Sequence, residues 1–297
     1  MARRVRPRVL ITGANGFLGR AFIERFADRY EIVGLGRAPS STSPTAPAPI
    51  DWLNADLREP LPLRDLPRRV DAVMHLASVR APSVAHAAQE LFSVNAAAVA
   101  ALLQYAKQVG ARFFILGSTG GVCGYRTAPI TERTTPAPFD LYTLSKWHGE
   151  TISRHFDSRS MAVAIVRYFF PYGPGQKSGI IARLVESIRT QSPLTLYSGG
   201  RHPVINPVFI DDACELTRRV LDARIRATIN CAGPQAATIR QIATIIGELS
   251  GRTPSFVRAR NNRITNMVGS LRVARQLVGF VPRVDLRAGL ANALGPL

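Results

Sequence analysis

The 297-residue chain has little of what metal proteins and secreted proteins depend on. Its three cysteines, Cys123, Cys214 and Cys231, are an odd number and lie far apart, without the spacing of a metal site or a disulfide framework. The five histidines are equally dispersed, so we predict no metal. Reduced thiols are typical of reducing compartments, and we therefore expect a cytoplasmic protein.

Long apolar runs and lysine are also scarce. No run reaches the roughly 18 consecutive apolar residues of a membrane span, and the basic residues 2–8 are not followed by the apolar segment of a signal peptide. Only three lysines occur, so the net charge of +18 is almost entirely arginine. These arginines are spread along the chain without a nucleic-acid recognition motif. We expect no membrane or nucleic-acid partner, and interpret the arginines as a solvated surface or as a means of steering an anionic substrate.

A glycine-rich segment lies near the start of the chain. Residues 8–12 form a short apolar run that predicts a buried parallel strand, and residues 17–26 have helical spacing. Between and within them, Gly13 permits a tight turn, Gly16 lets the backbone approach a pyrophosphate, and Gly19 lets the helix pack closely on the strand. Free N–H groups at the helix start would face the phosphates. The pattern predicts a dinucleotide-binding unit.

A tyrosine and a lysine stand four residues apart in a later segment with helical spacing, residues 141–156. Tyr142 and Lys146 therefore lie one turn apart on the same face. Moving a proton to or from a substrate oxygen suits a tyrosine whose pKa falls from its ordinary value of about 10, and a nearby lysine cation favours the phenolate. With the glycine turn, this pair indicates an enzyme that uses a nicotinamide dinucleotide on a hydroxyl or carbonyl substrate.

Several further segments complete a family pattern. They are Ala55-Asp56-Leu57, His75-Leu76-Ala77-Ser78, Asn95, residues 117–124, residues 167–176 and residues 206–212. With them the chain resembles, over nearly all its length, the extended short-chain dehydrogenases/reductases of the nucleotide-sugar epimerase/dehydratase group. The resemblance is specific for the family and leaves the substrate open.

The resemblance implies a set of site residues. The catalytic residues would be Thr119, Tyr142 and Lys146. Ser118 is the competing candidate for the role of Thr119, but the distance in sequence to residues 122–124 favours Thr119. The implied cofactor-binding residues are Gly13, Asn15, Gly16, Phe17, Leu18, Gly19, Gly36, Arg37, Asp56, Leu57, Leu76, Ala77, Ser78, Asn95, Gly117, Tyr142, Lys146 and Phe169. The implied substrate is a nucleotide-diphosphate sugar, and we expect a homodimer.

Departures from the family pattern narrow the chemistry. The family dehydratases carry acidic residues just after the catalytic threonine, whereas this chain has Gly120 and Gly121, which disfavours dehydration. Reductases that also epimerise at carbons 3 and 5 carry a cysteine at the position of Gly121; Cys123 lies two residues later, and we expect it to pack. Oxidation or reduction at one carbon remains, by a 4-epimerase or a 4-ketoreductase.

Two departures concern the substrate. Phe170 stands where many relatives have an asparagine that contacts the nucleotide-sugar, and Ile205 stands where many have an arginine that contacts its phosphate. Arg201, His202 and Asn206 lie near enough to substitute. We therefore predict Thr119, Phe170, Arg201 and Asn206 as substrate-binding residues.

The end of the second strand bears on the cofactor. NAD enzymes of this type usually place an acidic residue there, on the ribose 2′-hydroxyl, whereas this chain has Gly36 and Arg37. Gly36 leaves space and Arg37 can pair with a 2′-phosphate, so we predict NADP(H) over NAD(H). This favours a 4-ketoreductase. The alternatives are a 4-epimerase, a reductase of a non-sugar carbonyl, and a cofactor-binding sensor without turnover.

Strand and helix patterns alternate along the first half of the chain, which predicts an α/β protein with a doubly wound parallel sheet, a Rossmann fold. One long helix is expected over 92–109. We predict a dinucleotide-binding domain at 1–170, rejoined by 208–233. A smaller, mostly C-terminal substrate lobe is expected at 171–207 and 234–297.

Overall fold

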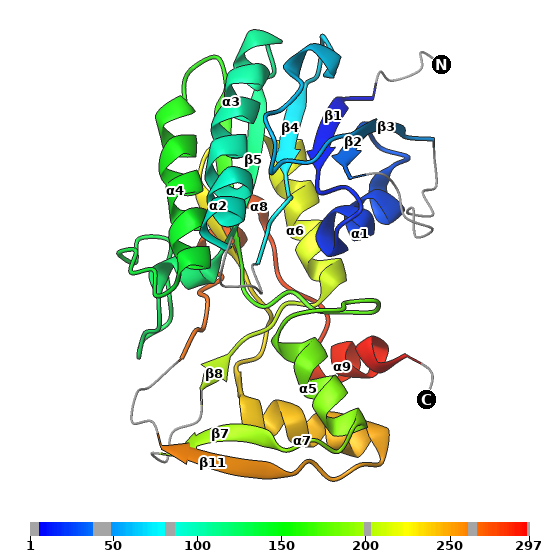
Figure 1. Ribbon diagram of the computed structural model, residues 1–297, viewed down its shortest axis with the longest axis vertical. Helices are drawn as coiled ribbons and strands as arrows, with labels where there is room; N and C mark the ends of the chain where they lie inside the picture. The colour runs from blue at the N-terminus through cyan, green and yellow to red at the C-terminus, as the bar shows by residue number, and fades with distance from the viewer. Residues whose placement is uncertain (1–5, 38–48, 81–86, 199–202, 261–265, 296–297) are drawn as a thin grey trace. The chain divides into compact units, whose positions relative to one another are not determined.

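The computed structural model describes residues 6–37, 49–80, 87–198, 203–260 and 266–295 (Figure 1). The chain divides into two compact units, and each is described by itself. Unit 1 comprises Met1–Val122, Pro138–Arg167 and Thr217–Ile229; unit 2 comprises Cys123–Ala137, Tyr168–Leu216 and Asn230–Leu297.

A seven-stranded sheet with the order β3-β2-β1-β4-β5-β6-β9 organises the first unit. The strands are β1 (Arg8–Thr12), β2 (Glu31–Gly36), β3 (Asp51–Asn54), β4 (Ala72–His75), β5 (Phe113–Thr119), β6 (Ala162–Tyr168) and β9 (Thr228–Cys231). Strand β1 pairs in parallel with both β2 and β4. The order therefore reverses between β1 and β4, which is the switch point where doubly wound sheets bind ligands. The predicted fold class is confirmed.

Helices cover the sheet because its strands are apolar on both faces. On one face, Leu10, Val73 and Phe114 pack in a single core cluster with Leu102 and Leu103 of α3 (Ala98–Gln108). Successive strand residues point to opposite faces, so Val9 and Ile11, both fully buried, face the other side.

The helix α1 (Phe17–Phe26) packs near the end of α6 (Ile210–Ala223) through side chains of unit 1. The Arg218 guanidinium lies 5.8 Å from the Phe26 ring centroid, and the Tyr30 hydroxyl donates to Asp222 Oδ1 at 2.5 Å. These contacts tie a helix from the start of the chain to one from near residue 220.

The helix predicted over 92–109 is interrupted. Helix α2 (Ala87–Phe92) is followed by a π-helical turn, Ser93–Ala97, and then by α3. By contrast, α4 (Leu141–Phe156) spans the predicted residues and lies beside α3 in Figure 1. Short 3₁₀ helices occupy Leu63–Asp65 and Gly120–Cys123.

Unit 2 contains two small sheets and four helices in its described part. Strand β7 (Leu194–Ser198) pairs in parallel with β11 (Phe256–Arg260), and β8 (Val204–Ile205) pairs with β10 (Ala237–Thr238). The helices are α5 (Ile180–Arg189), α7 (Ile239–Ser250), α8 (Arg272–Val278) and α9 (Leu286–Leu294). Helical spacing in the sequence predicts helices over 180–191, 238–250 and 270–278, which correspond to α5, α7 and α8, whereas the small sheets and α9 were not predicted.

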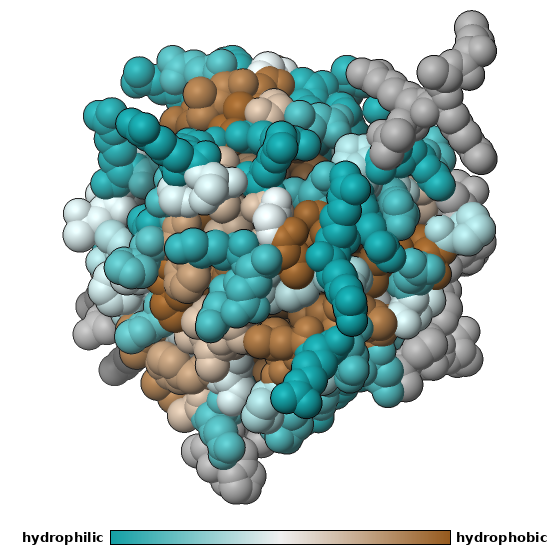
Figure 2. All heavy atoms as spheres, turned by 90° about the horizontal axis from the view of Figure 1, so that it is seen from above, coloured by the Kyte–Doolittle hydropathy of each residue, from teal (hydrophilic) through white to brown (hydrophobic). Residues whose placement is uncertain are grey.

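Figure 2 shows hydrophilic side chains spread over the face that it draws, with apolar patches between them. Within the described ranges, no helix is long and apolar enough to cross a membrane.

Candidate active site

The glycine turn after β1 has the shape that a pyrophosphate needs. Gly13 has a φ of +68°, and a Cβ there would lie 2.6 Å from the Ala77 nitrogen. A Cβ on Gly19 would collide with the Gly13 carbonyl oxygen. Helix α1 begins at Phe17 without a side-chain cap or an acidic residue in its first turn, so its N–H groups remain available to an anion. Asn15 and Leu18 complete this turn. The residues present fit a dinucleotide.

The ends of β2 and β3 form the region expected to hold the adenosine. The Asn15 amide donates to the Arg37 carbonyl at 2.9 Å, and a Cβ on Gly36 would lie 2.8 Å from Asn15 Oδ1. The space beside Gly36 is therefore filled by Asn15. The Arg37 side chain is exposed.

Asp56, predicted to contact adenine, follows β3 and is paired within the chain. Arg58 donates to its carboxylate through Nε at 3.0 Å and through Nη2 at 2.6 Å. The Arg58 hydrogen bonds hold the pKa of Asp56 below its usual value. The neighbouring Leu57 is buried. An adenine would have to share the Asp56 carboxylate with Arg58, and this contact stays a prediction.

The π-helical turn places Asn95 where three segments meet. Its amide donates to the Ser145 hydroxyl at 3.0 Å and to the Val79 carbonyl at 3.1 Å, and its Oδ1 accepts from the Ser78 hydroxyl at 3.2 Å. Asn95 is fully buried. It therefore joins the segment after β4 to α4. The wider turn of a π-helix is a common way to aim one such side chain at a site.

Strands β4 and β5 pack tightly beside the predicted cofactor region. A Cβ on Gly117 would lie 3.1 Å from Leu76 Cδ2, so only glycine fits without movement. Leu76 and Ala77 are half-buried, whereas Ser78 is exposed. These residues end their strands at the carboxyl edge of the sheet, where ligands bind in such folds.

Helix α4 begins with a capping box that fixes the segment carrying the tyrosine. The Asp140 side chain accepts from the Thr143 backbone N–H at 2.7 Å, and the Thr143 hydroxyl contacts the Asp140 backbone in return. The Ser145 hydroxyl donates to the Tyr142 carbonyl at 2.8 Å. The first turn of α4 is thus held at several points, which limits the freedom of Tyr142.

Burial and charge act in opposite directions on the tyrosine and the lysine. Burial holds the pKa of Tyr142 above its ordinary value, although the charge of Arg80 and a hydrogen bond with Ser78 act to lower it. The fold alone therefore does not give the lowered tyrosine pKa that proton transfer favours. Lys146 is 2% exposed, and burial lowers its pKa to about 8, although Glu150 opposes the shift. Burial, together with Lys146, lowers the pKa of His75 to about 3, so this histidine is neutral at physiological pH.

The two candidate hydroxyls at the end of β5 have different surroundings. Ser118 is buried and donates to Glu150 Oε1 at 2.7 Å, so its hydroxyl is engaged inside the fold. Thr119 is half-buried, and its Oγ1 accepts from the Gly121 N–H at 3.2 Å. This difference supports Thr119 as the residue that faces a substrate.

Glu150 lies at the centre of a buried ion cluster that the sequence analysis missed. Arg167 Nη2 and Arg154 Nη2 donate to its Oε2 at 2.7 and 2.6 Å. Burial raises the pKa of Glu150, but the hydrogen bond and charge of Arg167, the hydrogen bond of Ser118 and the charge of Arg154 together outweigh burial and hold that pKa below its usual value. Its position four residues after Lys146, on the same helix face, is the signal that could have found it.

The space beside Thr119 is closed. A Cβ on Gly121 would lie 2.8 Å from Thr143 Cγ2, and the Thr143 hydroxyl is held by Asp140 Oδ1 at 2.7 Å. A longer side chain at position 121 would have to displace the threonine that caps α4.

The remaining predicted residues belong to unit 2. Phe169 is buried, and Phe170 has a φ of +47°, a left-handed conformation that is uncommon for a phenylalanine. The Asn206 amide is buried and bonds both the Gly269 carbonyl and the Gly269 N–H at 2.9 Å. Asn206 thus holds the backbone of unit 2, and its contact with a substrate stays a prediction. Arg201 and His202 lie outside the described residues.

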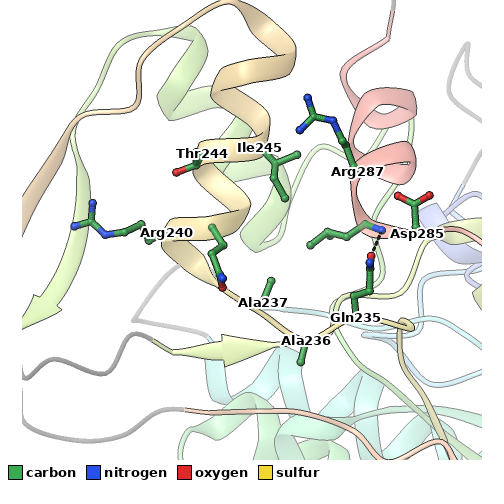
Figure 3. A pocket seen from close by; sticks show the side chains of 10 residues that line it. Gln235, Ala236, Ala237, Arg240, Thr244, Ile245, Asp285 and Arg287 are labelled. Atoms are coloured by element: carbon green, nitrogen blue, oxygen red, sulfur yellow. Dashed lines mark hydrogen bonds between the residues drawn. The ribbon is translucent and has the colours of Figure 1, made fainter.

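A hollow of about 450 Å³ between α7 and α9 belongs to unit 2 (Figure 3). Its polar groups are used within the fold: Gln235 accepts from the Leu286 N–H at 2.7 Å, and Asp285 caps α9. Arg240 lies over the Phe256 ring, with 4.4 Å from Cζ to the centroid. No residue predicted for the site lines it.

Comparison with known proteins agrees with the fold and the motifs. Residues 9–232 match the model of the NAD dependent epimerase/dehydratase family. The chain belongs to this family of nicotinamide-dependent enzymes, as the resemblance predicted.

The relatives include epimerases and decarboxylases. The chain is 26% identical to the uncharacterized UDP-glucose epimerase YtcB of Bacillus subtilis, over 98% of both chains. It is 24% identical to the UDP-N-acetyl-alpha-D-glucosaminuronate decarboxylase of Bacillus cytotoxicus, over 98% of this chain and 97% of that protein. The UDP-glucuronic acid 4-epimerase of Bacillus cereus, solved with UDP-glucuronic acid and NAD, has the same fold, with a TM-score of 0.86 and 24% identity over 97% and 98% of the two chains.

Proposed function

We propose that the protein is a nucleotide-sugar 4-epimerase. The observation that carries this proposal is the closed space beside Thr119, where Thr143 Cγ2 would lie 2.8 Å from any Cβ at position 121. An acid that eliminates water cannot stand there without rearrangement. The remaining groups, Thr119, Tyr142 and Lys146, are suited to moving one proton at one carbon.

The epimerase is favoured over the ketoreductase that Gly36 and Arg37 suggested. Two of the similar proteins described above are named as epimerases. An epimerase needs no further catalytic side chain beyond those that oxidise and reduce one carbon. It must only keep the intermediate and the cofactor in place between the two half-reactions.

The chain's own residues would divide the work as follows. A nicotinamide dinucleotide held at the turn of Gly13, Gly16 and Gly19 would supply reversible hydride transfer at carbon 4 of the sugar. Tyr142 accepts the proton from the 4-hydroxyl and gives it back, while Thr119 hydrogen-bonds the same oxygen. Lys146, one turn along α4, supplies positive charge beside the phenolate. We assign the substrate lobe to residues 171–207 and 234–297.

Product analysis tests the reaction. The purified protein is incubated with UDP-glucose, UDP-glucuronic acid, their 4-epimers and NDP-4-ketosugars, and the nucleotide sugars are separated. We expect interconversion of 4-epimers with no net change in nicotinamide absorbance. Consumption of one reduced cofactor per product would establish a ketoreductase instead, and release of a UDP-pentose would establish a decarboxylase. Turnover of none of these compounds would contradict the nucleotide-sugar assignment.

For the cofactor, we propose that the exposed Arg37 lets the site accept the 2′-phosphate of NADP(H) in preference to NAD(H). The support is its position directly after β2, whose last two residues, Leu35 and Gly36, carry no carboxylate. The test compares the dissociation constants of both cofactors for the wild type and for Arg37→Ser. The variant should lose affinity for NADP⁺ and keep that for NAD⁺. Tighter wild-type binding of NAD⁺ would contradict the proposal.

A further inference from the structure

An arginine lies against the tyrosine of the site. The guanidinium carbon of Arg80 is 5.3 Å from the centroid of the Tyr142 ring, within the range of a cation–π interaction. It lies over the face of the ring. The guanidinium therefore does not cover the edge that carries the hydroxyl, where Ser78 hydrogen-bonds.

The backbone that presents Arg80 is fixed. The peptide of the preceding residue, Val79, is held on both sides by Asn95, which donates to its carbonyl at 3.1 Å and accepts from its N–H at 3.4 Å. Asn95 in turn donates to Ser145 of α4. The same buried amide thus places the arginine and supports the helix of the tyrosine.

The two cations differ in how they respond to burial. Lys146 is almost fully buried and its pKa is lowered to about 8, so it loses part of its charge in mildly alkaline solution. Arg80 is exposed, and a guanidinium stays charged at every pH at which the protein is folded. The other charged neighbour of Tyr142 is Asp140, which opposes the phenolate. His75, beside Lys146, is neutral.

We propose that Arg80 is a positioning residue that acts through Tyr142, stabilising its phenolate and keeping positive charge beside it when Lys146 is deprotonated. The role rests on the proposed function only in so far as Tyr142 transfers the proton. Because the arginine is exposed, its effect is screened by salt, whereas the buried lysine is screened much less.

The experiment titrates Tyr142 directly and needs no substrate. Near-ultraviolet phenolate absorbance is followed against pH in the full-length protein, and the curve of Tyr142→Phe is subtracted, which leaves the titration of Tyr142. Arg80→Gln should raise its midpoint by about half to one pH unit, and Arg80→Lys should restore most of the wild-type value. The control, Arg64→Gln, removes an exposed arginine of the same unit and should leave the midpoint unchanged.

Salt supplies a measurement on the wild type alone. Raising the ionic strength should move the wild-type midpoint upward and narrow its difference from Arg80→Gln. An unchanged midpoint in Arg80→Gln, or an equal shift in Arg64→Gln, overturns the proposal. If Arg80→Gln does not fold, a wild-type midpoint that does not change with ionic strength overturns the proposal. Failure of the epimerase assignment would leave these titrations unaffected, so the two proposals fail separately.

Discussion

The predicted site residues of the two units are used differently. In unit 1, Tyr142 and Thr119 are half-buried, and neighbouring side chains hold the segments that carry them. In unit 2, the Asn206 amide is buried and engaged with Gly269, and Phe170 has an unfavourable backbone conformation. The residues predicted to react lie on β5 and in the first turn of α4, while the unit 2 residues predicted to touch the substrate also carry structural tasks.

The largest effect is expected at Tyr142. Tyr142→Phe removes the only group proposed to exchange a proton with the 4-hydroxyl, and turnover should fall at least about a hundredfold. Cofactor affinity, measured by fluorescence titration, should change little because the ring remains. A variant with near wild-type turnover would remove Tyr142 from the mechanism.

Glu150→Gln should reduce the stability of unit 1 more than it reduces catalytic activity. It removes the carboxylate that pairs with the buried Arg167 at 2.7 Å, and we expect a loss of about 3 kcal/mol in the free energy of unfolding, measured by urea titration. Glu186→Gln, which breaks the exposed pair with Arg189, is the control and should cause no measurable loss.

The same cluster predicts a pH dependence. The folded-state pKa of Glu150 lies below its usual value, so its contribution is complete above the unfolded pKa of about 4.3 and is lost as pH falls through the folded pKa. The stability difference between wild type and Glu150→Gln should therefore narrow in acid. A constant difference would mean that the carboxylate charge is not responsible.

Asn206→Ala tests whether this residue serves the fold of unit 2. It leaves the N–H and carbonyl of Gly269 without their partner, and should reduce the free energy of unfolding by about 2 kcal/mol. Asn206→Asp keeps an acceptor for the Gly269 N–H and should lose less. A rise in KM without any loss of stability would instead make Asn206 a substrate-binding residue.

The smallest effect is expected at Phe170. Asparagine tolerates a φ of +47° far better than phenylalanine, so Phe170→Asn should gain up to about 1 kcal/mol. Gln191→Asn, at a φ of +54° just after α5, is the matched control away from the predicted site. If Phe170→Asn loses stability and the control does not, the packing of the Phe170 ring contributes more to stability than its backbone conformation costs.

Local patterns explain what the sequence predicted well. Strand β1, α1 and α4 follow from an apolar run, a glycine turn and helical spacing, all within a few residues of one another. The conformation of Phe170 also gives a physical reason for the asparagine that the family pattern places there, because asparagine is enriched in left-handed conformations.

The elements and contacts that the sequence did not predict depend on partners that are distant in the chain. Strands β7 and β11 pair although about 60 residues separate them, and β8 and β10 are only two residues long. The π-helical turn has no signature in an alanine-rich segment, so one helix was predicted over 92–109. The backbone of Gly269 that engages Asn206, and the Ser118 and Arg167 side chains that engage Glu150, likewise come from segments that sequence spacing does not connect.

Thr143 links the start of a helix to the range of reactions open to this protein. Its hydroxyl completes the cap of α4, and its methyl group occupies the room beside Gly121. An evolutionary path from this chain to a dehydratase would therefore require an acid at 121 together with a smaller residue at 143. Serine at 143 would keep the hydroxyl of the cap and lose only the methyl group, whereas alanine would also weaken the start of the helix that carries Tyr142 and Lys146.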